Sequence, residues 1–567
     1  MKQNLIKIKL VLIIVALITL SNTQTSASTI TATPSNYASF IPSLIPGDVL
    51  YLSPGNYTNS LNIYSVMGTA LSPITITGSS LMTTFFDGKS GANTVSIKNS
   101  SYVIIKNLVI DGHSIPCTGD AIKAENGGSA LFFAHHITID GCDIKGYDGG
   151  NVSCDAQQHV GISTKCAAWD WVVKNNKIDN VGTGMYFGNS DGTQPFVNGI
   201  VEFNVITNTI GYNVEFKRQL DTVRNHFSGT NVNGKTIVRH NTFSKGANSS
   251  STGGFQRPVV LFGYWPSVGV GVNDYYEAYG NLFYNNPVES MLQFTGNVNF
   301  YDNVIINHYA ISSSFYNAIL IRDHYGVQPK NIKIFHNTIW TKYSDGGIKL
   351  QNPNPSYSQY CYDNAVFNDV TPSTGVTGFT LALDNVTDSY TNAANYIQSA
   401  STTLSLTNMQ PLVGQLTGTT TPSSIFSTYT DFNNDFNGCT YGWNYRGAYG
   451  ATGAASPWQL QMNKKTLTTC GAATAISKIN TTLNNNSVQV YPNPTSSNVN
   501  INFKDLQYDN LSIDILDVNG KLIDSFKCTS YVNNSIEINT SHLRNGLYII
   551  ILKSDNNIVA NKKILKL

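Results

Sequence analysis

The sequence predicts an all-β protein in which a long parallel β-solenoid is followed by a small antiparallel β-sandwich. Short alternating strands recur along most of the chain, and most of them end near Asn or Gly. The composition, with 31 Tyr, 25 Phe and 46 Gly and many Asn, Ser and Thr, favours strands and turns over helices. The C-terminal residues 488–567 alternate apolar and polar side chains in a pattern of their own.

The N-terminus has the pattern of an export signal. Lysines precede an apolar run over residues 10–20, and small residues follow it, which places cleavage after Ala27. This run is far shorter than the about 20 residues that a membrane-spanning helix requires. We therefore expect a signal peptide over residues 1–27, with an uncleaved anchor as the alternative, and no membrane span later in the chain.

The recurring strands of residues 28–455 predict the coils of the solenoid. In such a coil, alternate side chains point inward and stack on their counterparts in neighbouring coils. The bends between strands favour Asn or Gly, which tolerate left-handed backbone angles, and inward Asn side chains can form a hydrogen-bonded ladder. The Asn residues that mark the repeat are Asn204, Asn225, Asn241, Asn281, Asn303, Asn337 and Asn364. Their spacing is unequal: the shorter gaps suit one coil, and the longer ones suit a coil with an insertion or two coils.

Two stretches of the sequence resemble parts of a known family of parallel β-helix proteins. "IPGDVLYLSPGNYTNSLNIYSVMGTALSPITITG" (45–78) resembles the first coils of the right-handed parallel β-helix (pectin-lyase-like) superfamily. "YTDFNNDFNGCTYGWNYRGAYG" (429–450) resembles the closing coil of many members. The resemblance implies a right-handed parallel β-helix over residues 28–455.

The end of the chain predicts a linker and a second domain. Residues 456–487 include a polar, Asn-rich stretch typical of a linker. In residues 488–567 the blocks "YPNP", "DVNGKLI", "LRNGLYIIIL" and "KKILKL" occur in an order that resembles the type A C-terminal sorting domain of the type IX secretion system. This resemblance implies a Bacteroidetes-type source, the type IX machinery as partner, and a secreted or cell-surface protein. A carbohydrate-binding sandwich is the alternative.

The charge balance argues against a nucleic-acid partner, and the cysteine spacing argues against a zinc site. The 35 basic and 34 acidic residues give a net charge of +1 without any block of one sign, so a nucleic-acid partner is not expected. The eight cysteines match no zinc-binding spacing. Cys117, Cys142, Cys154 and Cys166 form one cluster and Cys439 and Cys470 a later candidate pair, with structural pairing or burial as the interpretations. We expect a monomer.

The segment "GYNVEFKRQLDTVRNHF" (211–227) concentrates charge in a chain that uses little of it. Glu215 and Lys217 alternate along one strand and so project from one face, whereas Arg218 points to the other. Arg239 and His240 follow in "TIVRHN", and the separation of Arg239 from Lys217 is close to the length of one coil. Lys217 and Arg239 are therefore expected on neighbouring coils facing one groove. The alternative is a solvated face of the helix.

Lys and Arg on one face suit eliminative cleavage of a uronate polymer. A base removes the C5 proton while a positive group neutralises the adjacent carboxylate. The arrangement resembles that of the chondroitinase B-like and alginate-lyase-like polysaccharide lyases. Residue by residue, the resemblance implies Lys217 as base, Arg239 as acid and His240 as the His that follows it, with Glu215 and Asn213 as ligands of a calcium ion. The family's Gly after Arg-His is Asn241 here.

Further residues are candidates for contact with a sugar chain. Arg218 and, in the insertion "FQRPVVLFGYWPSVG" (255–269), Arg257, Tyr264 and Trp265 are the candidates, because aromatic faces stack on sugars and Arg pairs with carboxylates. A loop packed on the helix is the alternative for the insertion. Arg322, Asp323 and His324 in "LIRDHYG" (320–326) form a second charged set.

The sequence thus predicts a secreted β-helix protein that acts on an acidic polysaccharide, with lyase chemistry as the leading hypothesis. The strings typical of polygalacturonase-like hydrolases are absent. A non-catalytic glycan-binding or adhesin-like solenoid is the alternative, and a glycoside hydrolase or epimerase is a further one. The large irregular insertions favour a specific ligand site over an adhesin.

Overall fold

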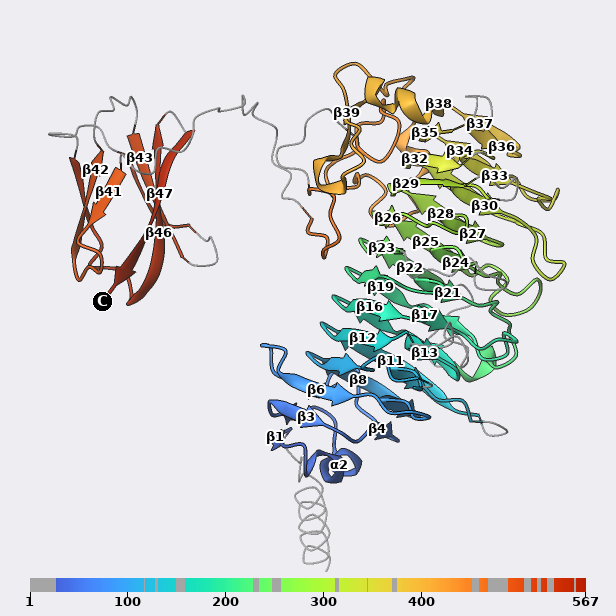
Figure 1. Ribbon diagram of the computed structural model, residues 1–567, viewed down its shortest axis with the longest axis horizontal. Coiled ribbons are helices and arrows are strands. Elements are labelled where there is room, and N and C mark those ends of the chain that lie inside the picture. The colour runs from blue at the N-terminus through green and yellow to red at the C-terminus, as the bar shows by residue number, and fades with distance from the viewer. Residues whose placement is uncertain are drawn as a thin grey trace, which may run out of the picture. The chain divides into compact units, whose positions relative to one another are not determined.

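The computed structural model describes residues 27–567 apart from 117, 128–130, 149–158, 228–233, 247–255, 312–315, 344, 370–374, 451–457, 468–487, 504–510, 518–521, 528–534 and 555–556. The chain divides into two compact units, residues 1–473 and 474–567 (Figure 1). The predicted signal peptide, apart from Ala27, and the Asn-rich part of the linker lie outside the described residues. No helix in the described part of the chain is long and apolar enough to cross a membrane.

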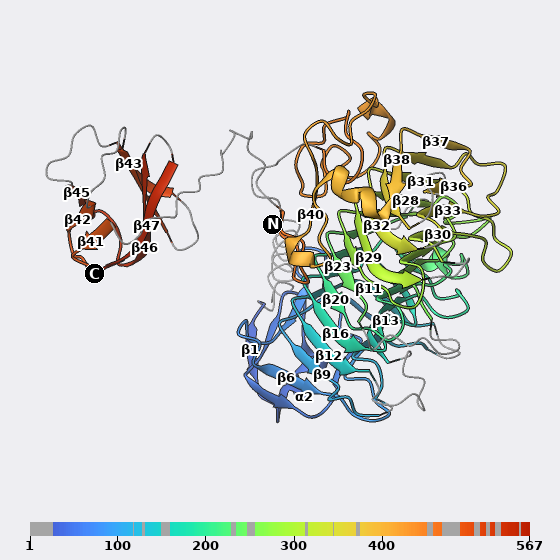
Figure 2. The ribbon, with the colours of Figure 1, turned by 45° about the horizontal axis from the view of Figure 1, so that its top comes forward.

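The first unit is a parallel β-helix with three sheets, which confirms the predicted fold (Figures 1 and 2). Along the helix, sheet A contains β1 (Thr29–Ala32), β2 (Val49–Leu52), β5 (Ile74–Thr77), β8 (Ser100–Lys106), β11 (Phe133–Asp140), β15 (Val172–Lys174), β19 (Ile200–Glu202), β22 (Lys235–Arg239), β25 (Tyr275–Tyr279), β28 (Val298–Tyr301), β31 (Ile332–Phe335), β34 (Tyr360–Tyr362) and β37 (Leu381–Leu383), with β14 (Ala167–Trp169) paired to β11 and β18 (Phe196–Val197) paired to β14.

Sheets B and C complete each coil. Sheet B contains β3 (Gly55–Tyr57), β6 (Thr84–Asp87), β9 (Val109–Asp111), β12 (Asp143–Tyr147), β16 (Lys177–Val181), β20 (Val205–Thr207), β23 (Thr242–Ser244), β26 (Leu282–Tyr284), β29 (Val304–Ile311), β32 (Thr338–Tyr343), β35 (Ala365–Asn368) and β38 (Val386–Ser389). Sheet C contains β4 (Leu61–Tyr64), β7 (Val95–Lys98), β10 (Ile122–Ala124), β13 (Val160–Thr164), β17 (Thr183–Phe187), β21 (Val214–Phe216), β24 (Val260–Phe262), β27 (Leu292–Phe294), β30 (Ile319–Ile321), β33 (Ile348–Leu350) and β36 (Val376–Thr377).

The corner between sheets A and B is short and repeats from coil to coil. It consists of one residue with left-handed backbone angles, such as His240 at φ 56°, followed by a buried Asn. Each Asn donates from its side-chain amide to the side-chain oxygen of the next at 2.8–3.0 Å, so that a ladder runs through Asn176, Asn204, Asn241, Asn281, Asn303, Asn337, Asn364 and Asn385. The predicted Asn ladder is therefore present.

Asn225 does not belong to this ladder. It lies in the short 3-10 helix η4 (Arg224–His226), inside a long connection from sheet C to sheet A. The coil that begins at Asn204 therefore ends at Asn241, 37 residues later. The sequence prediction divided this one coil into two because "VRNH" in the connection has the same letters as a strand that ends on Asn.

The segment after the last coil packs along the outside of the helix. It includes η6 (Tyr390–Asn395), the antiparallel pair β39 (Ile397–Ser399) and β40 (Asn408–Pro411), η7 (Leu404–Leu406) and η8 (Ser423–Ile425). Residues 426–450 and 458–467 then lie along the A–B corner: Arg446 pairs with Asp363 at 3.0 Å, and Lys465 donates to the Gly280 carbonyl at 2.6 Å. Residues 429–450 are thus an external strap rather than the closing coil expected, and residues 458–467 pack on the helix rather than forming linker.

Two short helices close the N-terminal end of the β-helix, and three of its cysteines are buried in the described part of its core as free thiols. Residues Tyr37–Phe40 (α2) and Ile41–Ser43 (η1) close the first coil, with Tyr37 buried against Tyr57 and Phe86. Cys142, Cys166 and Cys361 are buried free thiols, whereas Cys439 is disulfide-bonded. Its predicted partner, Cys470, lies outside the described residues, as do Cys117 and Cys154.

The second unit consists of two antiparallel sheets, as predicted for residues 488–567. One contains β41 (Val488–Tyr491), β42 (Asn498–Phe503) and β45 (Ser535–Asn539), and the other β44 (Leu522–Lys527), β43 (Leu511–Leu516), β46 (Gly546–Ser554) and β47 (Asn557–Lys566). Val499, Ile513 and Ile550 are buried in one shared core. Apolar and polar side chains alternate along these strands, so each sheet has one apolar face, and the two sheets pack these faces against each other away from water.

Candidate functional site

Sheet C is the face of the helix with long connections at both of its edges. The A–B corner takes only two residues, for example 203–204, because it carries the ladder. In the second half of the helix, the connections into sheet C include 245–259, and those leaving it include 217–234, 263–274 and 322–331. Insertions gathered on one side of a solenoid build walls around a binding face.

A row of cations follows the ends of the sheet C strands. Lys98 is the last residue of β7, and Lys165, Lys217 and Arg322 come directly after β13, β21 and β30. The residue before each of them points into the core, so each cation projects outward. The strands are in register, since Ser163 pairs with Tyr186 and Tyr186 with Glu215. Glu125 holds the in-register position between Lys98 and Lys165, so sheet C presents a row across the coils in which cations outnumber acids.

The centre of this face is a hollow of about 280 Å³ over β21, β24, β27 and β30. Its lining combines Glu215 and Lys217 with residues from later coils, and comprises Tyr212, Glu215, Lys217, Leu261, Gln293, Phe294, Thr295, Arg322, Asp323, His324 and Tyr325. The ammonium of Lys217 donates to Glu215 Oε1 at 2.9 Å. Burial disfavours the charged form of Lys217, but the Glu215 carboxylate outweighs it and raises the pKa of the ammonium.

Additional cations surround the hollow. The Arg218 guanidinium lies 4.4 Å from the ring centre of Tyr325 and donates to Tyr264 Oη at 3.4 Å. The Lys165 ammonium lies 3.0 Å from the ring centre of Tyr186, whose other neighbour is Lys217 at 5.5 Å. Because Glu215 already balances Lys217, the remaining cations leave the face attractive to an anionic chain.

Two groups at this face titrate away from their ordinary range. Burial lowers the pKa of Lys165 to about 8, against the opposing attraction of Asp120 and Glu215. Partial burial and the positive charges of Lys217, Arg218 and Arg322 lower the pKa of His324. His324 is therefore neutral at pH 7 and able to accept a proton, which is what a general base requires.

The residues of the hollow do not fit a calcium ion. Calcium takes six to eight oxygen ligands, mostly from carboxylates and carbonyls. Here Glu215 is paired with Lys217, and the Asn213 amide donates to the carbonyls of Ile206 and Ser244 inside the helix. Within the described ranges, no group of three or more His, Cys, Asp or Glu side chains is arranged to hold a metal.

The structure separates Lys217 from Arg239, which corrects the predicted pairing. Lys217 follows a strand of sheet C, whereas Arg239 ends β22 in sheet A. Arg239 stacks above Glu202 in register, pairs with it at 2.8 Å and also donates to Tyr279 Oη. The stretch of chain between Lys217 and Arg239 spans a long connection and one strand, not a whole coil.

His240 has a structural position at the A–B corner. It is the left-handed residue before ladder Asn241, and its ring stacks on Phe203 with centroids 5.1 Å apart. Burial and the neighbouring Lys465 lower its pKa well below the ordinary value. "VRHN" is thus the end of a strand, a corner residue and a ladder Asn.

The predicted sugar-binding residues fall into two groups. Arg218 was expected on the face opposite Lys217 but lies at the edge of the same hollow beside Tyr264, because β21 ends at Phe216 and its alternation does not reach Arg218. Tyr264 is only 6% exposed. The Arg257 guanidinium lies 5.6 Å from the ring centre of Tyr212, which lines the hollow. Trp265 is 1% exposed and packs on Tyr276 in the core. The sequence gives no signal for Lys165, and it indicates a separate charged set for Arg322 and His324. The structure brings all three to the face that carries Lys217.

Comparison with known proteins decides the nature of the C-terminal unit. Residues 489–566 match the family described as "Secretion system C-terminal sorting domain". This unit is a sorting domain. The protein is therefore exported, to the cell surface or beyond, and its sorting domain is the part that the secretion machinery recognises. No curated protein matches the chain.

The β-helix is similar in fold to solved polysaccharide-active proteins. An alginate lyase from Paenibacillus sp. str. FPU-7 matches with 16% identity over 58% of this chain and 99% of its own, at a TM-score of 0.39. The A-module of a mannuronan C-5 epimerase from Azotobacter vinelandii matches with 13% identity over 59% and 88%, at 0.34. Pectate lyase C from Erwinia chrysanthemi matches with 14% identity over 54% and 82%, at 0.27. These similarities are distant and concern the fold.

Proposed function

We propose that the protein binds an acidic polysaccharide along sheet C and cleaves it by β-elimination at the hollow around Lys217. The observation that carries this proposal is that Lys217, Arg322 and His324 line one hollow, although Lys217 lies far from the other two in the sequence. Elimination needs positive charge beside the uronate carboxylate and an uncharged base beside the C5 proton.

The residues divide the chemistry between them. Lys217 and Arg322 face the carboxylate, which stabilises the negative charge that develops as the C5 proton leaves. His324 takes that proton, and the electron pair forms the C4–C5 double bond while the bond from C4 to the bridging oxygen breaks. Tyr212 lines the same hollow and donates its phenol proton to that oxygen; since burial raises the pKa of this phenol, the transfer depends on the negative charge that develops on the leaving oxygen. His324 then releases its proton to solvent, and Tyr212 takes one up from solvent.

Other reactions have weaker support from this hollow. Glycoside hydrolysis needs two carboxyl groups across one sugar. Of the two acids that line the hollow, Glu215 is occupied by Lys217. Epimerisation shares the removal of the C5 proton but returns a proton to the opposite face of the sugar. A non-catalytic solenoid would need the row of cations but no neutral base.

A substrate panel tests the proposal. The full chain is incubated with alginate, pectate, chondroitin and heparin, with and without added calcium, and the ultraviolet absorbance of unsaturated uronate ends is followed. We expect absorbance to develop with at least one polymer, and not with His324→Ala. Inverted sugar signals in proton NMR without new ends would show an epimerase, and retention of polymer without either change would show a binding protein. Either outcome overturns the proposal.

A further inference from the structure

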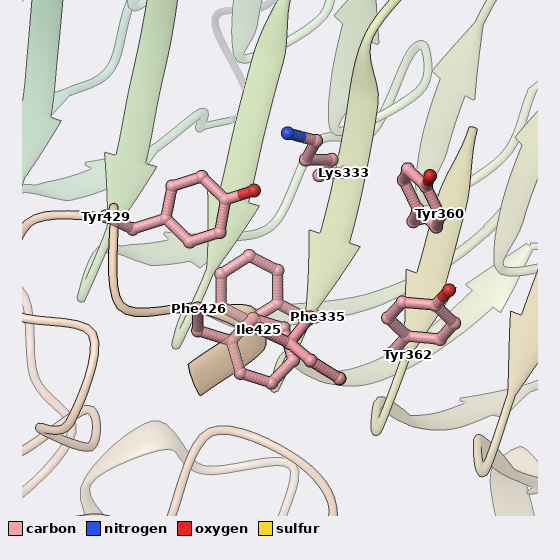
Figure 3. Close-up of a pocket in the computed structure, with 7 residues that line it drawn as sticks. All are labelled: Lys333, Phe335, Tyr360, Tyr362, Ile425, Phe426 and Tyr429. Carbon is pink, nitrogen blue, oxygen red and sulfur yellow. The ribbon is translucent and has the colours of Figure 1, made fainter. Parts of the chain in front are cut away.

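A second hollow lies on sheet A, outside the site described above. Figure 3 shows its seven side chains, with Tyr429 on one side, Tyr360 and Tyr362 on the other, and Lys333 between them. The strands β31 and β34 supply one wall in register, because Lys333 pairs with Tyr360 and Phe335 with Tyr362. The other wall is formed by Ile425 and Phe426, just before the strap, and by Tyr429 at its start, and the hollow measures about 240 Å³.

The floor of this hollow is rigid and its rim is aromatic. Phe335 is 1% exposed, and its ring stacks on Phe426 at 4.4 Å and on Tyr301 at 4.7 Å. Above this floor, the half-buried rings of Tyr360 and Tyr362 lie 5.5 Å apart, and Ile425 is 52% exposed. Rings that keep one face open on a fixed floor offer stacking surface at little entropic cost.

The polar groups around these rings suit a charged sugar chain. A neighbouring hollow of about 340 Å³ shares Lys333 and Tyr429 and adds Asn273, Asn299 and Asn331. Asn299 pairs in register with Lys333, so the two hollows form one groove across β28, β31 and β34. Three parallel strands span about 10 Å, which is about two sugar rings. Lys333 makes no ion pair with any residue in the described part of the chain, and its ammonium lies 5.4 Å from the ring centre of Tyr429.

We infer that this groove is a second binding site for an acidic polysaccharide. Sugar rings stack on Tyr360, Tyr362 and Tyr429, a carboxylate pairs with Lys333, and the Asn amides bind hydroxyl groups. An aromatic groove with a single cation and several amides fits such a chain better than a protein partner, whose interface core is depleted in charge. The site rests on the proposed function only for the class of its ligand, since it lies on a different sheet and contributes no group to cleavage.

The test separates this groove from the one on sheet C. Retardation in native gels that contain alginate, pectate or chondroitin is measured for Lys333→Ala/Tyr360→Ala, for Lys217→Ala/Arg322→Ala and for the two combined. Matched controls are Lys342→Ala and Tyr309→Ala, on strands of sheet B. Gels with neutral dextran test the requirement for charge, and circular dichroism checks that each variant is folded.

We expect the sheet A variant to raise the apparent Kd for an acidic polymer about tenfold in either background, and both controls to leave it unchanged. Cleavage of short oligosaccharides that fill only the sheet C hollow should keep its rate. Unchanged retardation of the sheet A variant with every polymer overturns the inference, and equal retardation by dextran overturns its acidic ligand. Cleavage is a readout of the sheet C proposal alone. If the wild-type protein cleaves no polymer, that proposal fails, and the binding test of the sheet A groove is unaffected.

Discussion

Replacement of Glu215 by Gln tests whether this carboxylate only balances Lys217 or takes part in the reaction itself. Its side chain is 7% exposed, and Oε1 accepts from the Lys217 ammonium at 2.9 Å. Gln keeps the shape and the accepting oxygen. The charged ammonium then donates to a neutral oxygen, and the attraction between the two charges is lost, which is worth about 1 kcal/mol at about 4 Å in a water-like medium and more where water is partly excluded. We expect the free energy of unfolding to fall by about 1–2 kcal/mol.

The same change makes the sheet C hollow around Lys217 more positive. A unit charge about 4 Å away contributes about 1 kcal/mol in a water-like medium, which corresponds to about fivefold in Kd. Glu215→Gln should therefore bind a polyuronate about fivefold more tightly at about 50 mM salt, and the gain should shrink at about 500 mM because the charges are screened. Titration calorimetry with size-defined oligouronates measures both values.

Glu202→Gln is the matched control, because Glu202 forms the equivalent pair with Arg239 on sheet A. It should lose similar stability and leave binding unchanged. A loss of binding or of cleavage by more than tenfold in Glu215→Gln, with the fold intact, would refute the reasoning. That result would assign Glu215 a direct role, either in the reaction or in holding a calcium ion.

Three further predictions concern the ladder, the pH dependence and the strap. Asn281→Ala leaves the buried backbone N–H of Asn241 without its acceptor and should lower the free energy of unfolding by about 2–3 kcal/mol, whereas exposed Asn62→Ala should change it by less than about 0.5 kcal/mol, as measured by guanidinium unfolding. The pKa of Lys165 is lowered to about 8, so its positive charge is lost as the pH rises through 8. The KM for a polyuronate should therefore rise above pH 8 in the wild type and remain lower at pH 9 in Lys165→Arg. Parallel pH profiles of the two proteins would contradict this. Arg446→Leu leaves the buried Asp363 carboxylate without its partner and should cost about 3–5 kcal/mol in the same unfolding assay, and a cost below about 1 kcal/mol would show that the strap does not depend on this pair.

The fold could be predicted from sequence because its determinants are local. Alternation along a strand fixes which side chains face the core, and an Asn after a left-handed residue fixes the corner, so most ladder positions followed from the letters alone. Asn225 failed because a short 3-10 helix inside a connection has the same letters, and no local rule distinguishes the two.

The site was harder to predict because it depends on the lengths of the connections. Glu215 and Lys217 were correctly assigned to one face, since they alternate along one strand. Arg239 was assigned to the wrong face because the connection 217–234 was counted as a strand and a corner. Arg322 and His324 reach Lys217 only through the stacking of β21, β24, β27 and β30, which requires the register of every coil between them.

The most direct test of the central claim compares cations on the two sheets. Initial rates of unsaturated-end formation on the preferred polyuronate are measured for His324→Ala, Arg322→Ala and Arg239→Ala, each checked for folding by circular dichroism. The sheet C site predicts a loss of about 100-fold or more for His324→Ala, a smaller loss for Arg322→Ala, and a rate within about threefold of the wild type for Arg239→Ala. Retained activity in His324→Ala together with inactive Arg239→Ala would contradict it and place the reaction on sheet A.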